Sequence, residues 1–356
     1  MLKPVYLFQG ETLLPQQISL DSLLNHTETL KSAPCKSAEL LNQTVFTSTL
    51  ADEPLKDIGA ERMVRKTSER QARWLIATGV RSWRRYISAP QSSKAGLFIG
   101  LGTVDCDEED NPELVAEPTA ECLSAAMLEE RRPLICLALL NSSATSHIAQ
   151  LAGITGENMS FSPLQSAGFN ALCEGYFAIA EGRIKYALCG GGSQKVTPWS
   201  LLAYESIWAK QDNFWLTEAA AFVVASDEAR LNERVANGVL RHIQRASLQN
   251  NDESLTQKVN HLMQSAWIEA RSIVKVILVG ASPKQCEVTL RVLGDDLSAQ
   301  AVILDRYVGT TMAASAAIAC NSALFYLQAY KEGVVIAITF GDHAEFGTFI
   351  IEANND

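Results

Sequence analysis

The sequence predicts an α/β protein built of two similar halves. Short continuous apolar runs that end in glycine, typical of buried strands, alternate with segments whose apolar residues recur at helical spacing. The same succession of strands and helices occurs before and after a change in character near Ser226, without detectable sequence repetition. We therefore divide the chain of 356 residues into residues 1–226 and 227–356, and expect helices to pack on the sheet faces.

The first half contains the clearest patterns. Residues 65–87 carry Ala72, Leu75, Ile76, Val80 and Trp83 at the spacing of a helix that buries one face. Strands are expected at 95–102, 158–162, 185–193 and 217–226, and helices within 119–130, 140–156 and 166–181. The last helix stops at Gly182, a typical glycine cap. Gly190 to Gly192 lack the spacing of a phosphate-binding loop and indicate a tight strand exit with closely packed backbones.

The second half begins with a polar stretch, residues 227–270, which we interpret as helical with a break at 248–254. A strand is expected at 274–280, helices near 284–292 and within 309–333, and a pair of strands at 334–341 and 347–353.

Composition and spacing exclude several classes of protein. A net charge of −10 argues against a nucleic acid or an anionic membrane surface as partner, because phosphates are held by clustered Lys and Arg. The short basic clusters at 81–86 and 129–133 are interpreted as solvated helix faces, although an acidic carrier protein would also favour them. No run of about 18 apolar residues and no signal peptide occurs, so we expect a cytoplasmic protein.

The cysteines and histidines do not suggest a metal site or a disulfide framework. The eight cysteines form no C-x-x-C pair, and the five histidines have no spacing that places two ligands on one helix face. Only His343 lies in a loop between two apolar strands, where a solvated histidine is the ordinary interpretation. We expect neither a bound metal nor a cofactor.

Residues 140–194 resemble the β-ketoacyl synthase family of the thiolase fold. The resemblance rests on Leu140-Asn141, Gly153 and Gly156, the strand 158–162, Ile179 to Gly182, and Gly190-Gly191. The strand that starts at Glu218 and the helix start at 308–319 look like two further family motifs, so the resemblance extends from about residue 60 to the end. It implies a thiolase-like fold, two similar βαβα-type halves that form an α-β-α-β-α layered structure.

The resemblance also implies that the catalytic residues of the family are absent. The nucleophilic cysteine falls on Gln165, and an amide nitrogen is essentially non-nucleophilic. The first histidine falls near Val279 to Ser282 and the second on Thr310, while Asp305 stands where the family usually has lysine. A decarboxylase that carries glutamine at the nucleophile position would keep both histidines. The three degenerate positions are therefore Gln165, Val279 and Thr310.

This pattern of losses is similar to that of the chain-length factor, a catalytically silent subunit that pairs with an active ketosynthase in type II polyketide or aryl polyene systems. The resemblance then implies a heterodimer, with the strand Asn158, Met159, Ser160, Phe161 and Ser162 at its centre. The growing chain, borne by phosphopantetheine on an acyl carrier protein, would lie in a tunnel at this interface. Phe161 and Phe169 are candidates for closing it, although plain core packing suits both, and residues 112–127 resemble a tunnel-lining insertion.

Two alternatives remain open at this point. In the first, the chain would be a homodimeric scaffold that binds an acyl ligand without a synthase partner. In the second, it would be a diverged acyltransferase with another nucleophile. Cys173 and Cys189 are the candidates for that nucleophile, but each lies in a segment predicted to be buried, where a thiolate is disfavoured.

Overall fold

A computed structural model describes most of the chain. The described residues are 2–35, 45–52, 55–60, 62–88, 94–102, 134–162, 164–197, 200–201, 215–249, 251–265, 272–341 and 344–354.

Ten strands form one continuous sheet made of two equivalent blocks. The first block has the order β5 (Asn158–Phe161), β4 (Ala95–Gly100), β6 (Tyr186–Gly192), β8 (Ala220–Ser226) and β1 (Val5–Leu13). The second has the order β13 (Ala301–Ile303), β12 (Ile273–Val279), β14 (Val334–Phe340), β15 (Glu345–Ala353) and β11 (Gly238–Ser247). In each block the first three strands are parallel and the last two pair antiparallel, and the blocks join where β1 pairs with β11.

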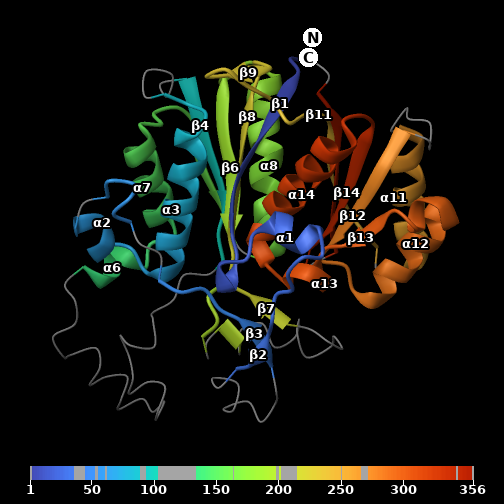
Figure 1. Ribbon diagram of the computed structural model, residues 1–356, viewed down its shortest axis with the longest axis horizontal. Coiled ribbons are helices and arrows are strands. Elements are labelled where there is room, and N and C mark those ends of the chain that lie inside the picture. The colour runs from blue at the N-terminus through green and yellow to red at the C-terminus, as the bar shows by residue number, and fades with distance from the viewer. Residues whose placement is uncertain are drawn as a thin grey trace.

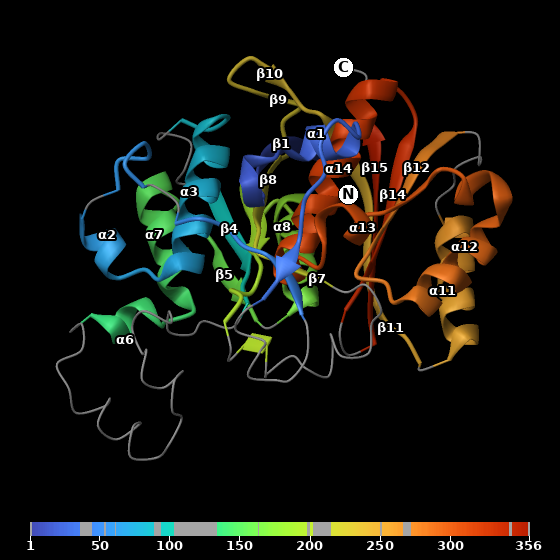
Figure 2. The same ribbon diagram turned by 60° about the horizontal axis from the view of Figure 1, so that its bottom comes forward.

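Helices form three layers around this sheet. On one outer side α3 (Arg70–Arg84) and α7 (Ser142–Ala152) cover the first block, and on the other α11 (Asp252–Ser265) and α12 (Pro283–Ser298) cover the second (Figure 1). Between the blocks lie α8 (Gln165–Ala180) and α14 (Ser315–Tyr330), which share one apolar core with both (Figures 1 and 2). The α-β-α-β-α order is confirmed.

The middle helix α14 is almost wholly apolar because protein surrounds it. The stretch Met312–Tyr330 is long and apolar enough to cross a membrane, but 78% of its most apolar window is buried inside the protein. A helix that is hydrophobic all round belongs in the core of a large protein or in a membrane, and its burial here identifies it as a core helix.

Smaller elements complete the chain. A three-stranded sheet of β2 (Ala33–Pro34), β3 (Phe46–Ser48) and β7 (Trp215–Thr217) lies below the large sheet in Figure 1. Strands β9 (Arg230–Leu231) and β10 (Arg234–Val235) form a hairpin. The remaining helices among the described residues are η1 (Pro15–Gln17), α1 (Leu20–Leu24), α2 (Arg62–Lys66), α6 (Ile135–Ala138), α13 (Asp305–Val308) and η6 (Met312–Ala314).

Local sequence signals explain where several helices begin and end. The Glu69 carboxylate accepts hydrogen bonds from the backbone N–H groups of Gln71 and Ala72 and so caps α3. Ser282 precedes Pro283, the first residue of α12, and forms a capping box with Gln285 in the first turn. Gly153 takes the left-handed conformation that ends α7. These signals are local in the sequence, which is why the helices were predicted within a few residues.

Two sequence-based expectations are wrong. Residues 227–247 are not helical, because they form the β9–β10 hairpin and the long strand β11, whose outer residues are polar since they face solvent. The single strand expected at 217–226 is divided between β7 and β8, which belong to different sheets. The polar residues of this stretch have no clear period, and β11 is a strand rather than the expected helix because it pairs with β15. The division into two units at 226/227 stays a prediction.

Asn321 of α14 joins the middle layer to the sheet at an irregularity in β1. Its Oδ1 accepts from the N–H of Gly10 (3.3 Å), and its Nδ2 donates to Thr12 Oγ1 (2.9 Å) and to the carbonyl of Phe222 (3.0 Å). The residue is fully buried. The register of β1 on β8 shifts between Gln9 and Thr12, and the amide bonds the backbone freed by that shift.

Replacing Asn321 by leucine should lower the free energy of unfolding by about 2–4 kcal/mol, because buried backbone groups of β1 and β8 lose their partners. The matched control is Gln328→Ala on the exposed side of the same helix, which removes only a surface contact with Gln9 and should change stability by less than about 0.5 kcal/mol. Urea unfolding followed by circular dichroism measures both. Equal effects would contradict this role for Asn321.

Candidate functional site: a buried glutamine at the start of α8

The ends of parallel strands and the starts of the two middle helices meet at one place. Gly100 ends β4 and packs against Gly168 in the first turns of α8, and Gly191, near the end of β6, packs against Ala313 of η6. A Cβ at Gly168 or Gly191 would overlap the carbonyl oxygen of Ala313, and a Cβ at Gly100 would overlap the backbone of Gly168. Such close backbone approach requires glycine. The prediction of close packing at Gly190 to Gly192 is therefore confirmed, within β6 rather than beyond its end.

Gln165 is the first residue of α8 and is held by a strained turn. The residue before it, Leu164, has φ 75° and ψ −160°, which costs a non-glycine residue roughly 1–3 kcal/mol. The Leu164 side chain packs in an apolar cluster with Val196, Leu216 and Met312, and this packing offsets the strain. The side chain of Gln165 is 94% buried at a helix N-terminus, a place whose dipole favours negative charge, yet it carries a neutral amide.

The amide of Gln165 lies against the segment in which the first family histidine was expected. A Cβ at Gly280 would overlap the Gln165 side chain, and Gly280 has φ 74°, so glycine is required on both grounds. Val279 ends β12 and is fully buried. Thr310 lies between α13 and η6 and exchanges backbone hydrogen bonds with Trp215 and Thr217. The structure thus brings Gln165 and Val279-Gly280 together, while Thr310 supports the small sheet.

Asp305 is a buried carboxyl group beside this segment. Its Oδ2 accepts from the Gly280 N–H (2.7 Å), and its Oδ1 is buried with no hydrogen-bond partner among the described residues. Burial raises the pKa of Asp305 from 3.8 to about 7, although the Gly280 hydrogen bond opposes the shift. At neutral pH a substantial fraction of Asp305, which was expected at the family's lysine position, is therefore protonated.

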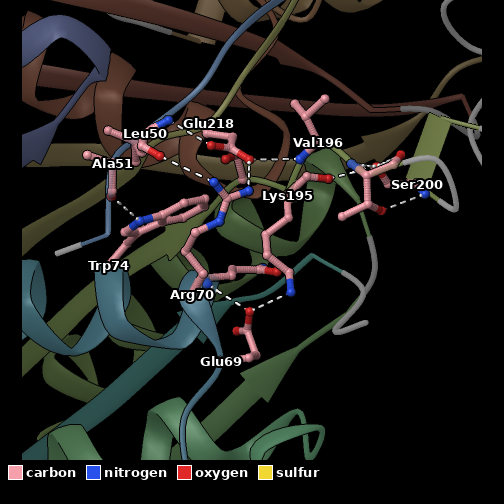
Figure 3. A network of polar contacts seen from close by, with 12 residues as sticks. Leu50, Ala51, Glu69, Arg70, Trp74, Lys195, Val196, Ser200 and Glu218 are labelled. Carbon is pink, nitrogen blue, oxygen red and sulfur yellow. Dashed lines mark hydrogen bonds and ion pairs between the residues drawn. The ribbon is translucent and has the colours of Figure 1, made fainter. Parts of the chain in front are cut away.

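One buried and one partly buried ion pair hold the loop after β6 against the start of α3 (Figure 3). Lys195 is wholly buried and its Nζ lies 2.9 Å from the Glu69 carboxylate. Arg70 donates to the Glu218 carboxylate (2.8 Å), which also accepts from the N–H groups of Leu50 and Val196. Figure 3 shows the four charged side chains converging from α3, the loop after β6 and the start of β8.

This network fixes the local backbone more than it poises a reactive group. Burial raises the pKa of Glu218 to about 7, and the Arg70 guanidinium and two backbone N–H groups oppose that shift. Burial likewise raises the pKa of Glu69, against the nearby Lys195. Removal of one member would leave a buried charge without its partner, which typically costs 3–5 kcal/mol. Sequence analysis missed Glu69, Arg70 and Lys195. The only signal was a lysine in an otherwise small and apolar stretch.

The candidate alternative nucleophiles lie in the core. Cys173 of α8 and Cys189 of β6 are both buried. Burial raises the pKa of Cys173 to about 12 and raises that of Cys189 as well. A thiolate is the reactive form, and these surroundings disfavour it at neutral pH.

Strand β5 is the last strand at one edge of the large sheet among the described residues, and it is largely exposed, with Met159 42% accessible. The N–H of Leu97 donates to the carbonyl of Glu157, and that of Leu101 to the carbonyl of Phe161. Backbone groups of successive residues point to alternate sides of a strand. The N–H and C=O groups of Met159 and Phe161 therefore face β4, while those of Asn158 and Ser160 point outward. The side chain of Ser160 bonds Thr145 of α7 (2.6 Å).

The two phenylalanines predicted as tunnel candidates occupy different places. Phe161 is half-buried at the end of β5 and packs against the central core. Phe169 is buried on α8, stacks with Phe349 of β15 and lines a pocket. Ser162 follows β5 directly. His343, the insertion at residues 112–127 and the basic cluster at 129–133 lie outside the described residues.

A pocket of about 340 Å³ opens beside Gln165, between the first turns of α8, the end of β11 and the β14–β15 turn. Its lining includes Asn170, Arg245, Ser247, Thr339 and Glu345. Sequence analysis did not single out Arg245 or Glu345, because both lie on strands whose pairing no local pattern shows.

Comparison with known proteins identifies the family. The sequence model of the β-ketoacyl synthase N-terminal domain matches residues 32–227, more than half of the chain. The chain therefore belongs to the β-ketoacyl synthase family, and its layered structure is the thiolase-like fold. No curated protein sequence matches it significantly.

Solved structures with the same fold are distant in sequence. The ishigamide ketosynthase/chain length factor has a TM-score of 0.76 at 12% identity, covering 98% of this chain and 99% of that one. A type II ketosynthase in complex with its acyl carrier protein and bound to a hexaketide (AntDE:AntF) has a TM-score of 0.74 at 15% identity, with coverage of 99% and 100%. The module 6 ketosynthase of the bacillaene synthase from Bacillus subtilis 168 has a TM-score of 0.72 at 13% identity, with coverage of 99% and 71%.

The raised pKa of Asp305 predicts a pH-dependent stability. A carboxyl group with a higher pKa in the folded than in the unfolded state stabilises the protein at low pH, and this contribution is lost as pH rises from about 4 to about 7. Asp305→Asn mimics the neutral form. It should therefore raise the free energy of unfolding above pH 7 by of the order of 2 kcal/mol, with the gain vanishing near pH 4.

Denaturant unfolding at pH 4, 6 and 8 measures this difference. Asp296→Asn at an exposed position of α12 is the matched control. A gain that is the same at all three pH values would show that the carboxyl group does not titrate in this range.

Proposed function

We propose that this chain is the noncatalytic, chain-length-factor-type subunit of a β-ketoacyl-ACP synthase complex. The observation that carries the proposal is the buried amide of Gln165 at the first turn of α8, packed on Gly280, in the place where the family's nucleophile falls. The fold and the strained turn at Leu164 are kept, while the group that would take an acyl chain is replaced.

The neighbouring positions support the absence of condensation by this chain alone. In the family two histidines stabilise the carbanion left by decarboxylation, and Val279 and Thr310 carry no group that stabilises negative charge in this way. Asp305, whose raised pKa favours a neutral carboxyl, supplies no cation in place of the family's lysine. Cys173 and Cys189 are buried in the core, which disfavours the acyltransferase alternative.

The free edge of β5 supports association with a second, ketosynthase-like subunit. An open strand edge with unpaired N–H and C=O groups pairs readily with another chain. Met159 of β5 is 42% exposed and Phe177 of α8 is 38% exposed, which provides apolar area that a partner can bury. A related solved structure is itself a ketosynthase/chain length factor pair. On this proposal the partner is an active ketosynthase that carries the acyl chain, and β5 pairs with its counterpart.

The function of such a subunit is to shape the space into which the chain grows. Apolar burial favours each added unit until a side chain blocks the tunnel, so the silent subunit sets product length. The substrate is an acyl or polyene chain delivered by an acyl carrier protein, as in the relative solved with its carrier protein and a hexaketide. Among the described residues, Phe161 at the end of β5 is the candidate for the side chain that blocks the tunnel.

Co-expression with the neighbouring ketosynthase of the same genome tests the proposal. The expected result is a stable one-to-one complex by size-exclusion chromatography that elongates a carrier-bound chain, with this subunit inert alone. A separate homodimer, together with a ketosynthase that is fully active without it, would favour the acyl-binding scaffold instead.

Ser160→Pro should abolish the complex while leaving the fold intact. Proline removes the outward N–H of β5 but none of the N–H groups that face β4, and edge strands accept proline at such positions. Analytical ultracentrifugation of the mixture should show association weakened at least about tenfold.

Two control variants separate pairing from folding. Ser160→Ala loses the hydrogen bond to Thr145 but keeps the N–H, and should still associate. Met159→Pro removes an N–H that faces β4, and should lower the melting temperature. An unchanged complex of Ser160→Pro would exclude backbone pairing through β5.

Gln165→Cys should not restore condensation, because the two histidine positions remain empty. The variant is paired with a ketosynthase whose own nucleophile is replaced by alanine, so that any carbon–carbon bond formation arises from this chain. The measurement is product detection by mass spectrometry from malonyl- and acyl-carrier proteins. Detectable elongation would contradict the account of the lost residues.

A further inference from the structure

The pocket beside Gln165 contains two opposite charges that have no ion-pair partner among the described residues. Its lining has Arg245 from β11 and Glu345 from β15. Register places Arg245 opposite Gly347, and Ser247 opposite Glu345. Since alternate residues of a strand share a face, all four positions lie on the same side of the sheet, toward α8. Both charges therefore point into the space between this sheet and α8.

Another charge pair on the same two strands shows what is unusual here. Arg241 and Glu352 form an ion pair with each other at 2.5 Å. In the part of the chain that the structure describes, neither Arg245 nor Glu345 has an ion-pair partner, although both line the pocket. Oppositely charged groups that share a pocket without pairing are available to a ligand.

Arg245 is exposed to solvent, and Asn170 of α8 contacts its guanidinium. One N–H donates to Oδ1 of Asn170 on α8 (3.0 Å). Arginine has five such donors in a fixed fork that matches a carboxylate. The first turn of α8, which supplies Gln165 and Ser166 to the lining, adds the positive end of a helix dipole on the same side. This side of the pocket suits an anionic group.

Glu345 adds a negative group to the same pocket. Its carboxylate lies over Gly341, where a Cβ would overlap it, so glycine keeps that space open. An ionised carboxylate accepts hydrogen bonds only, so it selects an ammonium or another N–H donor. Phe169 supplies an apolar wall beside both charges. A volume of about 340 Å³ is near the lower limit for small-molecule sites.

We infer that this pocket binds a small free zwitterion of amino-acid size, with its carboxylate on Arg245, its ammonium on Glu345 and its apolar part against Phe169. This site goes beyond the proposed function. It needs no partner subunit, so it stands or fails independently of the heterodimer.

Three matched probes test the assignment by isothermal titration calorimetry on the full chain. L-Phenylalanine carries both charges, 3-phenylpropionate lacks the ammonium, and 2-phenylethylamine lacks the carboxylate. The expected result is that L-phenylalanine binds at least about tenfold more tightly than either of the other two, because each charge-assisted contact contributes about that much.

Single substitutions assign each charge to its end of the ligand. Arg245→Gln should weaken L-phenylalanine binding about tenfold and leave the affinity for 2-phenylethylamine unchanged. Glu345→Gln should also weaken L-phenylalanine binding about tenfold, but leave the affinity for 3-phenylpropionate unchanged. The control is Arg241→Gln, which removes a charge of the same type on the same strand outside the pocket and should change nothing. Circular dichroism confirms that each variant is folded.

Three outcomes would overturn the inference. Equal affinity for L-phenylalanine and 3-phenylpropionate would reduce the pocket to a simple anion site. Absence of saturable binding of all three probes up to their solubility would show that no zwitterion of this size binds. Binding of a carrier-linked phosphopantetheine arm that L-phenylalanine does not displace would likewise assign the pocket to the carrier protein.

Discussion

The close packing of two helix starts against two strand ends is the constraint on which the rest of the structure depends. The carbonyl of Ala313 lies where Gly168 of α8 and Gly191 of β6 lack side chains, and Gly100 admits the backbone of α8. This contact locks α8 and α14 side by side between the two blocks of the sheet. The contact therefore positions the start of α8, which carries Gln165 and forms one wall of the pocket.

Polar interactions define the irregular parts that the apolar layers leave open. Asn321 satisfies the backbone where β1 changes register, and the two ion pairs of Figure 3 hold the loop after β6 against α3. A buried ion pair is weak evidence for net stability, because desolvation offsets much of the attraction. Its effect here is geometric, since each carboxylate also accepts backbone N–H groups and so fixes one loop conformation.

The start of α8 combines a strained backbone with an unreactive side chain. Strain at Leu164 persists because an apolar cluster compensates it, and the residue that the turn presents is the amide Gln165. On the functions proposed here, the outward edge of β5 meets a protein partner, and the pocket of Arg245 and Glu345 receives a small ligand.

The sequence by itself determined the layered α/β fold, the family and the place of Gln165, because helical period, glycine stops and short motifs are local. It failed at residues 227–247, where polarity suggested helix and pairing with β15 imposed a strand. Only the tertiary structure decided which distant groups meet. Arg70 and Glu218 are 148 residues apart in sequence, and Gln165 of the middle helix α8 reaches Gly280, which follows β12 of the second block. No local pattern encodes such contacts, since they arise when packing of the layers brings separate elements to one edge.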